Sequence, residues 1–150
     1  MITAIDVAEY ILKKTGPITA MKLQKLVYYA QAWHLAWTEN VLFEDKIEAW
    51  KNGPVMSSLF NHHKGCLKLY SGFFTDKIKP REILPLNNDQ QDVVNRVIHF
   101  YGSKDPHWLS QLTHMEDPWK IARSKSTFSD EERSTEEITP LSMLEYYTSL

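Results

Sequence analysis

The residues best suited to chemistry in this sequence lie close together, between Leu109 and Arg123. This stretch contains His114 together with the acids Glu116 and Asp117. A histidine near a carboxylate can act as a general base, so the stretch is the first candidate for an active site. The pair Asp117-Pro118 predicts a break between two short helices, because Asp caps a helix start and Pro suits the first helical turn.

Catalysis at this stretch needs groups that the sequence alone does not bring together. His107 lies seven residues before His114, and one helix through both would place the two rings on one face. A reaction also needs a nucleophile, a base and an orienting group in contact, whereas Ser110, Thr113 and Cys66 are separate candidates. A small hydrolase or nuclease centred on His114 therefore stays an alternative, and we assign no catalytic residue.

The segment His62-His63-x-x-Cys66 is a fragment of a metal-binding pattern. A structural zinc ion needs four ligands, and Cys66 is the single cysteine of the chain. A single cysteine also excludes an internal disulfide, which fits a reducing compartment. The five glycines are scattered and form no phosphate-binding loop. We therefore expect no bound metal and no cofactor.

Length and composition indicate one domain over residues 1–150. The chain is 43% hydrophobic and has five tryptophans, which is enough to build one core. Its first residues lack the basic and then apolar pattern of a signal peptide. No apolar run approaches the ~20 residues that cross a bilayer. We expect a cytoplasmic protein with no membrane partner.

The charges are distributed unevenly along the chain. Residues 1–81 contain 11 Lys and Arg against 7 Asp and Glu, whereas residues 82–150 contain 6 against 12. Binding to DNA or RNA normally requires a strongly basic surface, so the net charge of -2 argues against a nucleic-acid partner. A transcriptional regulator is kept as a further alternative.

Helical periodicity dominates the first forty residues. Thr3 followed by Asp6 predicts a capped helix that ends at Gly16-Pro17. Thr19 then begins a longer helix, and the pattern changes after Asn40. The apolar stripe of this second helix contains Leu23, Leu26, Val27, Ala30, Trp33, His34 and Trp37.

The second helix is also apolar on its other side. No charged residue lies between Leu26 and Thr38, so we expect neighbours around the helix and place it at the centre of the fold. Trp33 and Trp37 lie on its apolar stripe and are assigned to the core.

The middle of the chain predicts short extended pieces. Residues 41–43 and 47–50 suit isolated strands or a small hairpin with a bend between them. Asn52-Gly53-Pro54 predicts a turn that leads directly into a helix of about three turns, ending near His62. Between Gly65 and Asn88, single Gly and Pro residues predict loops with one or two short strands.

The C-terminal part predicts several short helices that start abruptly. Asn88 and Gln91 form a capping pair for a helix that Gly102 ends. A capping residue followed by proline then occurs three times, at Asp105-Pro106, Asp117-Pro118 and Thr139-Pro140.

The polar segment Ser124–Glu137 separates the last two of these starts and predicts a mobile loop with a helical turn near residues 129–132. The last helix should dock on the core through Leu141, Met143, Leu144 and Tyr147. We therefore predict a mainly α fold: a single compact domain of several short helices around one long central helix, with a small β-hairpin or short extended strands.

Three segments carry a combined pattern that is more specific than any one of them. They are Met21–His34, Ala49–Val55 and the run Leu109-Ser110-x-Leu112-Thr113-His114-x-x-x-Pro118-Trp119-x-x-Ala122-Arg123. In this order they resemble the Panacea antitoxin domain, also called the SocA-like or GepA-type domain. The resemblance spans nearly the whole chain, from about Ile5 to Tyr147.

The resemblance implies a bacterial or prophage-encoded antitoxin that is not an enzyme. It implies a cognate protein toxin, encoded in an adjacent gene, that the antitoxin neutralises by direct binding. One type of member delivers its toxin to an ATP-dependent protease, which makes such a protease the second partner to consider. The family is a shared scaffold with variable contact surfaces, and this chain lacks the DNA-binding extension that operator binding would need.

The residues that match the motifs are our candidates for partner binding or for the structural signature of the family. Arg123 either pairs within the fold or meets a partner beside Trp119, and both interpretations stay open. The candidates are Lys25, Trp50, Gly53, Pro54, Thr113, His114, Pro118, Trp119, Lys120 and Arg123.

Overall fold

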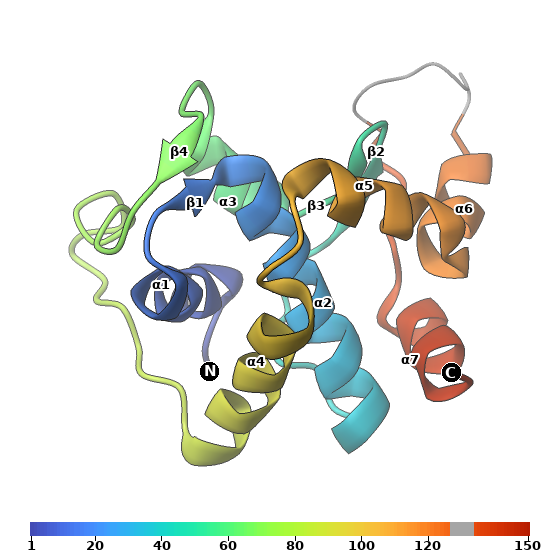
Figure 1. Cartoon of the computed structure of the whole chain (residues 1–150), viewed down its shortest axis with the longest axis horizontal. Coiled ribbons are helices and arrows are strands. Elements are labelled where there is room, and N and C mark those ends of the chain that lie inside the picture. Colours follow the sequence, from blue (N-terminus) through green and yellow to red (C-terminus); the bar gives the residue numbers. More distant parts are fainter. Residues whose placement is uncertain (127–133) are drawn as a thin grey trace.

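Helices make up most of the fold. A computed structural model describes residues 1–126 and 134–150. In these ranges the order of elements is α1 (Ala4–Thr15), β1 (Ile18–Thr19), α2 (Ala20–Thr38), β2 (Glu48–Trp50), β3 (Gly53–Val55), α3 (Ser57–His63), β4 (Lys68–Leu69), α4 (Asn88–Tyr101), α5 (Pro106–Met115), α6 (Asp117–Ser124) and α7 (Pro140–Thr148) (Figure 1). The predicted fold class is confirmed, and no helix within the described ranges is long and apolar enough to cross a bilayer.

Helix α2 is the central helix, as predicted. It contacts α1, α4, α5 and α7, and Figure 1 shows these helices around it. The side chain of Thr19 caps it by accepting a hydrogen bond from the Lys22 N–H. The assignment of Trp37 to the core was wrong, because its side chain is 43% exposed on the last turn of α2. Trp33, one turn earlier, is half-buried.

The small hairpin differs from the one that the sequence suggested. Strand β2 pairs with β3, so Gly53-Pro54 forms a strand and not the entry to a helix. Helix α3 begins only at Ser57. Residues 41–43 form no strand, because the Gln31 side chain binds their backbone: its Oε1 accepts from the Leu42 N–H at 2.7 Å and its Nε2 donates to the Phe43 carbonyl at 2.7 Å.

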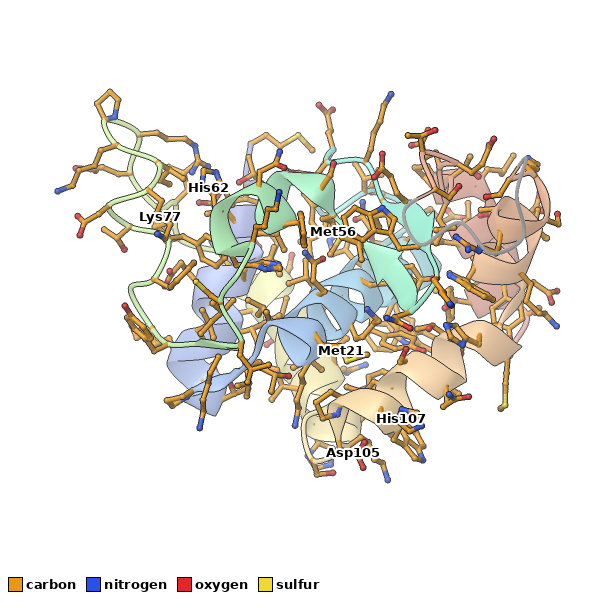
Figure 2. All side chains as sticks on the ribbon, turned by 90° about the horizontal axis from the view of Figure 1, so that it is seen from above. Met21, Met56, His62, Lys77, Asp105 and His107 are labelled. Atoms are coloured by element: carbon orange, nitrogen blue, oxygen red, sulfur yellow. The ribbon has the colours of Figure 1, made fainter. Side chains whose placement is uncertain are left out.

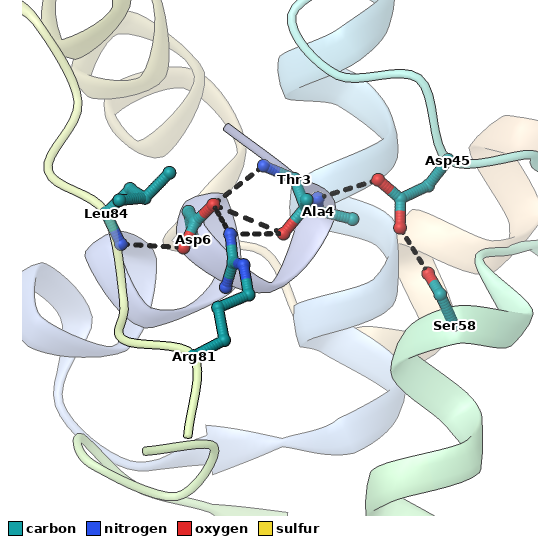
Figure 3. Close-up of polar contacts among 7 residues, drawn as sticks. All are labelled: Thr3, Ala4, Asp6, Asp45, Ser58, Arg81 and Leu84. Carbon is teal, nitrogen blue, oxygen red and sulfur yellow. Dashed lines mark hydrogen bonds and ion pairs between the residues drawn. The ribbon is translucent and has the colours of Figure 1, made fainter. Parts of the chain in front are cut away.

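The long loop before α4 is fixed to α1 by two buried acids. Asp6 accepts a hydrogen bond from the Leu84 N–H at 2.8 Å and forms an ion pair with Arg81 at 2.5 Å (Figure 3). Glu9 accepts hydrogen bonds from two further backbone N–H groups of this loop, at Gly72 and Phe74. The loop also contains β4, which pairs with β1, so the expected short strand is confirmed.

Two of the predicted helix caps were placed one residue too late. The capping box of α4 is Asn87 with Gln90, because the helix begins at Asn88. The cap position of α6 is Glu116 and not Asp117. The side-chain caps at Asp105 and Thr139 are confirmed.

The end of the chain returns to the hairpin and to α2. The Ala49 N–H of β2 donates to the Glu136 carbonyl at 3.0 Å. The C-terminal end of the segment Ser124–Glu137, which the sequence predicted as a loop, therefore pairs with β2. The helical turn predicted near residues 129–132 lies outside the described residues. Helix α7 packs on α2 as predicted, with Met143 and Tyr147 buried, whereas Leu141 is exposed.

Candidate functional site

The β2–β3 hairpin is held by side chains that come from three different helices. From α2, Gln24 Oε1 accepts from the Met56 N–H at 2.9 Å and Nε2 donates to the Met56 carbonyl at 3.2 Å. The next residue, Lys25, donates from Nζ to the Pro54 carbonyl at 3.2 Å. Adjacent polar residues of the central helix therefore fix the strand β3 and the residue after it.

Helices α5 and α6 bind the other part of the same hairpin. The Ser110 hydroxyl donates to the Asn52 carbonyl. Trp119 Nε1 donates to the Trp50 carbonyl at 2.8 Å, and Arg123 Nη1 donates to the Ala49 carbonyl at 3.0 Å. We call the contacts of Gln24, Lys25, Ser110, Trp119 and Arg123 with residues 49–56 the hairpin network. It joins the three sequence segments that share the motif pattern.

Gly53 is required by the close approach of two helices to the hairpin. Its φ of 121° lies in a region that L side chains rarely adopt. A Cβ at this position would lie 2.5 Å from Lys25 Cε and 2.9 Å from Thr113 Oγ1. The motif residues Lys25, Gly53 and Thr113 therefore fit together as one packed unit.

Lys25 is a buried cation. Its side chain is 2% exposed, and none of the ion pairs among the described residues includes it. Burial disfavours the charged ammonium group and lowers the pKa of Lys25 from 10.5 to about 8. The charged form of Lys25 is therefore disfavoured in the fold, where its Nζ donates a hydrogen bond to the Pro54 carbonyl.

His114 stacks on Trp119, with ring centroids 4.2 Å apart and an interplanar angle of 27°. Its Nε2 is buried and has no hydrogen-bond partner in the described parts of the chain. Desolvation and the charge of Lys25 lower the pKa of His114, and a hydrogen bond with the Lys51 backbone opposes them.

The acids near His114 in sequence face other groups. Asp117 lies 3.7 Å from Lys120 in an exposed ion pair. Glu116 is buried and accepts hydrogen bonds from the Tyr29 hydroxyl at 2.7 Å and the Tyr147 hydroxyl at 2.9 Å. Across the described residues, the structure therefore does not place a carboxylate on His114 as a general base would require.

The buried carboxyl of Glu116 is the centre of a tyrosine cluster that the sequence did not predict. The hydroxyls of Tyr28 and Tyr147 lie 3.0 Å apart, and Tyr29 stacks on Tyr101 with centroids 4.2 Å apart. Burial raises the pKa of Glu116, while the hydrogen bonds from the two tyrosines lower it. The adjacent Tyr28 and Tyr29, in the stretch of α2 that carries no charge, were the available signal in the sequence. Their shared environment could not be predicted, because Glu116 is far away in the chain.

The metal-like fragment does not form a site in the part of the chain that the structure describes. No three metal-ligating side chains gather there. His63 Nε2 lies 3.0 Å from Gln24 Nε2, and Cys66 is exposed. Figure 2 shows His62 on α3 far from His107 on α5, so these histidines do not meet.

The ten candidate residues are mostly used within the fold. Lys25, Gly53, Pro54, Thr113 and Pro118 are buried. Trp50, His114, Trp119 and Arg123 are half-buried, and Lys120 is exposed. The motif therefore coincides with the hairpin network, while the predicted role of these residues in partner binding stays a prediction.

Comparison with known families identifies the family of the chain. Residues 23–120 match the family described as antitoxin SocA-like, Panacea domain. Searches of curated proteins and of solved structures found no match. The matched region covers about two thirds of the chain and contains most of α2, the hairpin, α5 and the start of α6. The chain therefore belongs to the SocA-like Panacea antitoxin domain family.

Proposed function

We propose that this protein is the antitoxin of a bacterial toxin–antitoxin pair, acts in the cytoplasm and neutralises a cognate protein toxin by binding it directly. Membership of the antitoxin family carries the proposal. Neutralisation by occlusion needs only a complementary surface, with most of the affinity coming from a few buried anchors.

Co-expression with the neighbouring reading frames tests this function. Each adjacent small protein is induced alone and together with this chain, and growth is measured. We expect one of them to arrest growth alone and to be harmless in the pair. Neighbours that are all harmless, or a toxic neighbour that stays toxic in the pair, would contradict the proposal.

A variant at His114 separates binding from the hydrolase alternative. If the chain acts by binding, a folded His114→Ala variant should neutralise the toxin to the extent that it still binds it, which circular dichroism and titration calorimetry check. Loss of neutralisation by a folded variant whose toxin affinity is unchanged would favour a catalytic histidine instead.

Delivery to an ATP-dependent protease is the second mechanism that we propose to test. It predicts a shorter half-life of the toxin in cells that contain this protein, and a normal half-life when the protease is deleted. Occlusion predicts a stable complex and an unchanged toxin half-life in both strains.

A further inference from the structure

An aromatic groove lies between the C-terminal halves of α2 and α4, two helices that contact each other and are inclined to one another in Figure 1. Its volume is about 350 Å³. The lining contains no charged side chain and consists of Trp33, Trp37, Val97, Phe100 and Tyr101. We call these five residues the aromatic groove.

The floor of the aromatic groove is fixed by contacts with the core. Trp33 Nε1 donates a hydrogen bond to the Tyr101 hydroxyl at 2.9 Å. Tyr101 stacks on the buried ring of Tyr29, and Trp33 packs on Tyr147 with centroids 5.4 Å apart. A ligand that enters this groove would therefore meet a preformed surface, and little conformational entropy would be lost on binding.

The walls of the aromatic groove are exposed to an extent that packing in the fold does not explain. Trp37 stacks on Trp33 and is 43% exposed, and Phe100 on the opposite wall is 65% exposed. Contiguous exposed aromatic surface commonly marks an interaction site. Tryptophan and arginine are also enriched among the residues that dominate binding energy.

A cation lies over the ring of Trp37, one of the residues that line the aromatic groove. The guanidinium carbon of Arg96 is 5.4 Å from the centroid of the Trp37 ring. Arg96 is exposed and belongs to none of the ion pairs among the described residues. Its fork of N–H donors matches a carboxylate, so the charge at the groove favours an acidic group on the ligand.

We propose that the aromatic groove is the docking site for the cognate toxin, and that it takes a large apolar side chain of the toxin. An Asp or Glu next to that side chain pairs with Arg96. This inference rests on the proposed function and adds to it a surface and the chemistry of the partner. The groove is the central anchor of a larger contact area, which in stable complexes is about 800 Å² per partner.

The chain offers a matched control outside the aromatic groove. Trp108 on α5 is 44% exposed, close to the exposure of Trp37, and Lys104 Nζ lies 4.9 Å from the centroid of its ring. This pair has an exposed tryptophan and a cation but is not part of the groove lining. Variants at Trp108 and Lys104 therefore show whether toxin affinity falls when any exposed tryptophan or cation is replaced, wherever it lies on the surface.

The first experiment measures the affinity of the purified toxin by titration calorimetry. We expect Trp37→Glu to weaken binding by roughly 30-fold or more and Arg96→Glu by about 10-fold, in line with a central anchor and its charge partner. Trp108→Glu and Lys104→Glu should stay within about twofold of the original chain, as rim positions do. Circular dichroism checks that each variant is folded.

The outcomes separate the two proposals. If folded Trp37→Glu and Arg96→Glu variants bind the toxin with unchanged affinity, the aromatic groove is not the docking site. The proposed antitoxin function would not be affected by that result. A dimer of the original chain in sedimentation that Trp37→Glu dissociates would also overturn the docking site, because the occupant would be a second copy.

A second experiment does not need the toxin. The protein is labelled with 5-fluorotryptophan and titrated with 3-phenylpropionate, which carries an apolar ring beside a carboxylate. We expect saturable ¹⁹F shifts at Trp33 and Trp37, weaker binding in Arg96→Gln, and no shift at Trp108. Absence of saturation at Trp37, or equal shifts at Trp108, would overturn the inference even if every neighbouring gene proved harmless.

Discussion

Lys25 Nζ lies 3.2 Å from the Pro54 carbonyl oxygen, and this contact joins the central helix to strand β3. It depends on Gly53, since a Cβ there would lie 2.5 Å from Lys25 Cε. The lysine and the glycine belong to separate sequence segments, yet the lysine has room only because position 53 carries no side chain. Their fit explains why the motif residues meet inside the molecule.

Replacing Gly53 by alanine should destabilise the fold strongly. The added Cβ would clash with Lys25 and Thr113 and would also be strained at a φ of 121°. We expect a loss of roughly 2–4 kcal/mol in the free energy of unfolding, measured in urea, as for other overpacked and strained sites. Gly65→Ala is the control, because its φ is 85° but nothing lies within 4 Å of the new Cβ. A similar loss in both variants would show that backbone strain alone is responsible.

The charge of Lys25 should make the stability depend on pH in the alkaline range. Burial lowers its pKa from 10.5 in the unfolded chain to about 8 in the folded protein. Between these values the unfolded chain binds more protons, so the free energy of unfolding rises with pH, by about 1–2 kcal/mol from pH 8 to pH 9.5.

The variant Lys25→Met should lack this rise in denaturation experiments across the same pH range, because it removes the titrating group while keeping a similar volume. Lys64 is exposed, and Lys64→Met should retain the rise. An identical pH profile for Lys25→Met and the original chain would show that Lys25 does not titrate in this range.

Glu116 should have the opposite effect in the acidic range. Burial raises its folded pKa above the ordinary 4.5, so stability falls as the pH rises through the window above 4.5. Glu116→Gln keeps an acceptor for Tyr29 and Tyr147 but removes the titrating carboxyl, so the free energy of unfolding should no longer fall as the pH rises above 4.5. Glu116→Leu leaves both hydroxyls without their acceptor and should lose roughly 2–4 kcal/mol. Equal stability of the Gln and Leu variants at every pH would contradict the importance of these hydrogen bonds.

The sequence predicted those features that depend on local signals. Thr19, Asp105 and Thr139 cap helices where the pattern placed them, because a cap is a contact between neighbours in the chain. Helix α2 was identified as central because it lacks charges along most of its length.

The features that the sequence did not predict depend on contacts between distant residues. Gly53-Pro54 has the local pattern of a helix entry, but Lys25 holds it as a strand from 29 positions away. Glu116 turns away from the helix start that it caps and reaches Tyr29, 87 positions away. Trp33 and Trp37 lie on the same stripe of α2, but Trp33 is half-buried whereas Trp37 on the last turn is 43% exposed, and the periodicity of the stripe does not distinguish them.

Direct binding of the toxin is the central claim, and titration calorimetry with the purified neighbouring toxin tests it most directly. We expect saturable binding with a Kd of about 10⁻⁷ M or lower, which is typical of a stable complex of standard interface size. If the chain neutralises that toxin in cells but the two purified proteins show no binding, direct neutralisation is contradicted.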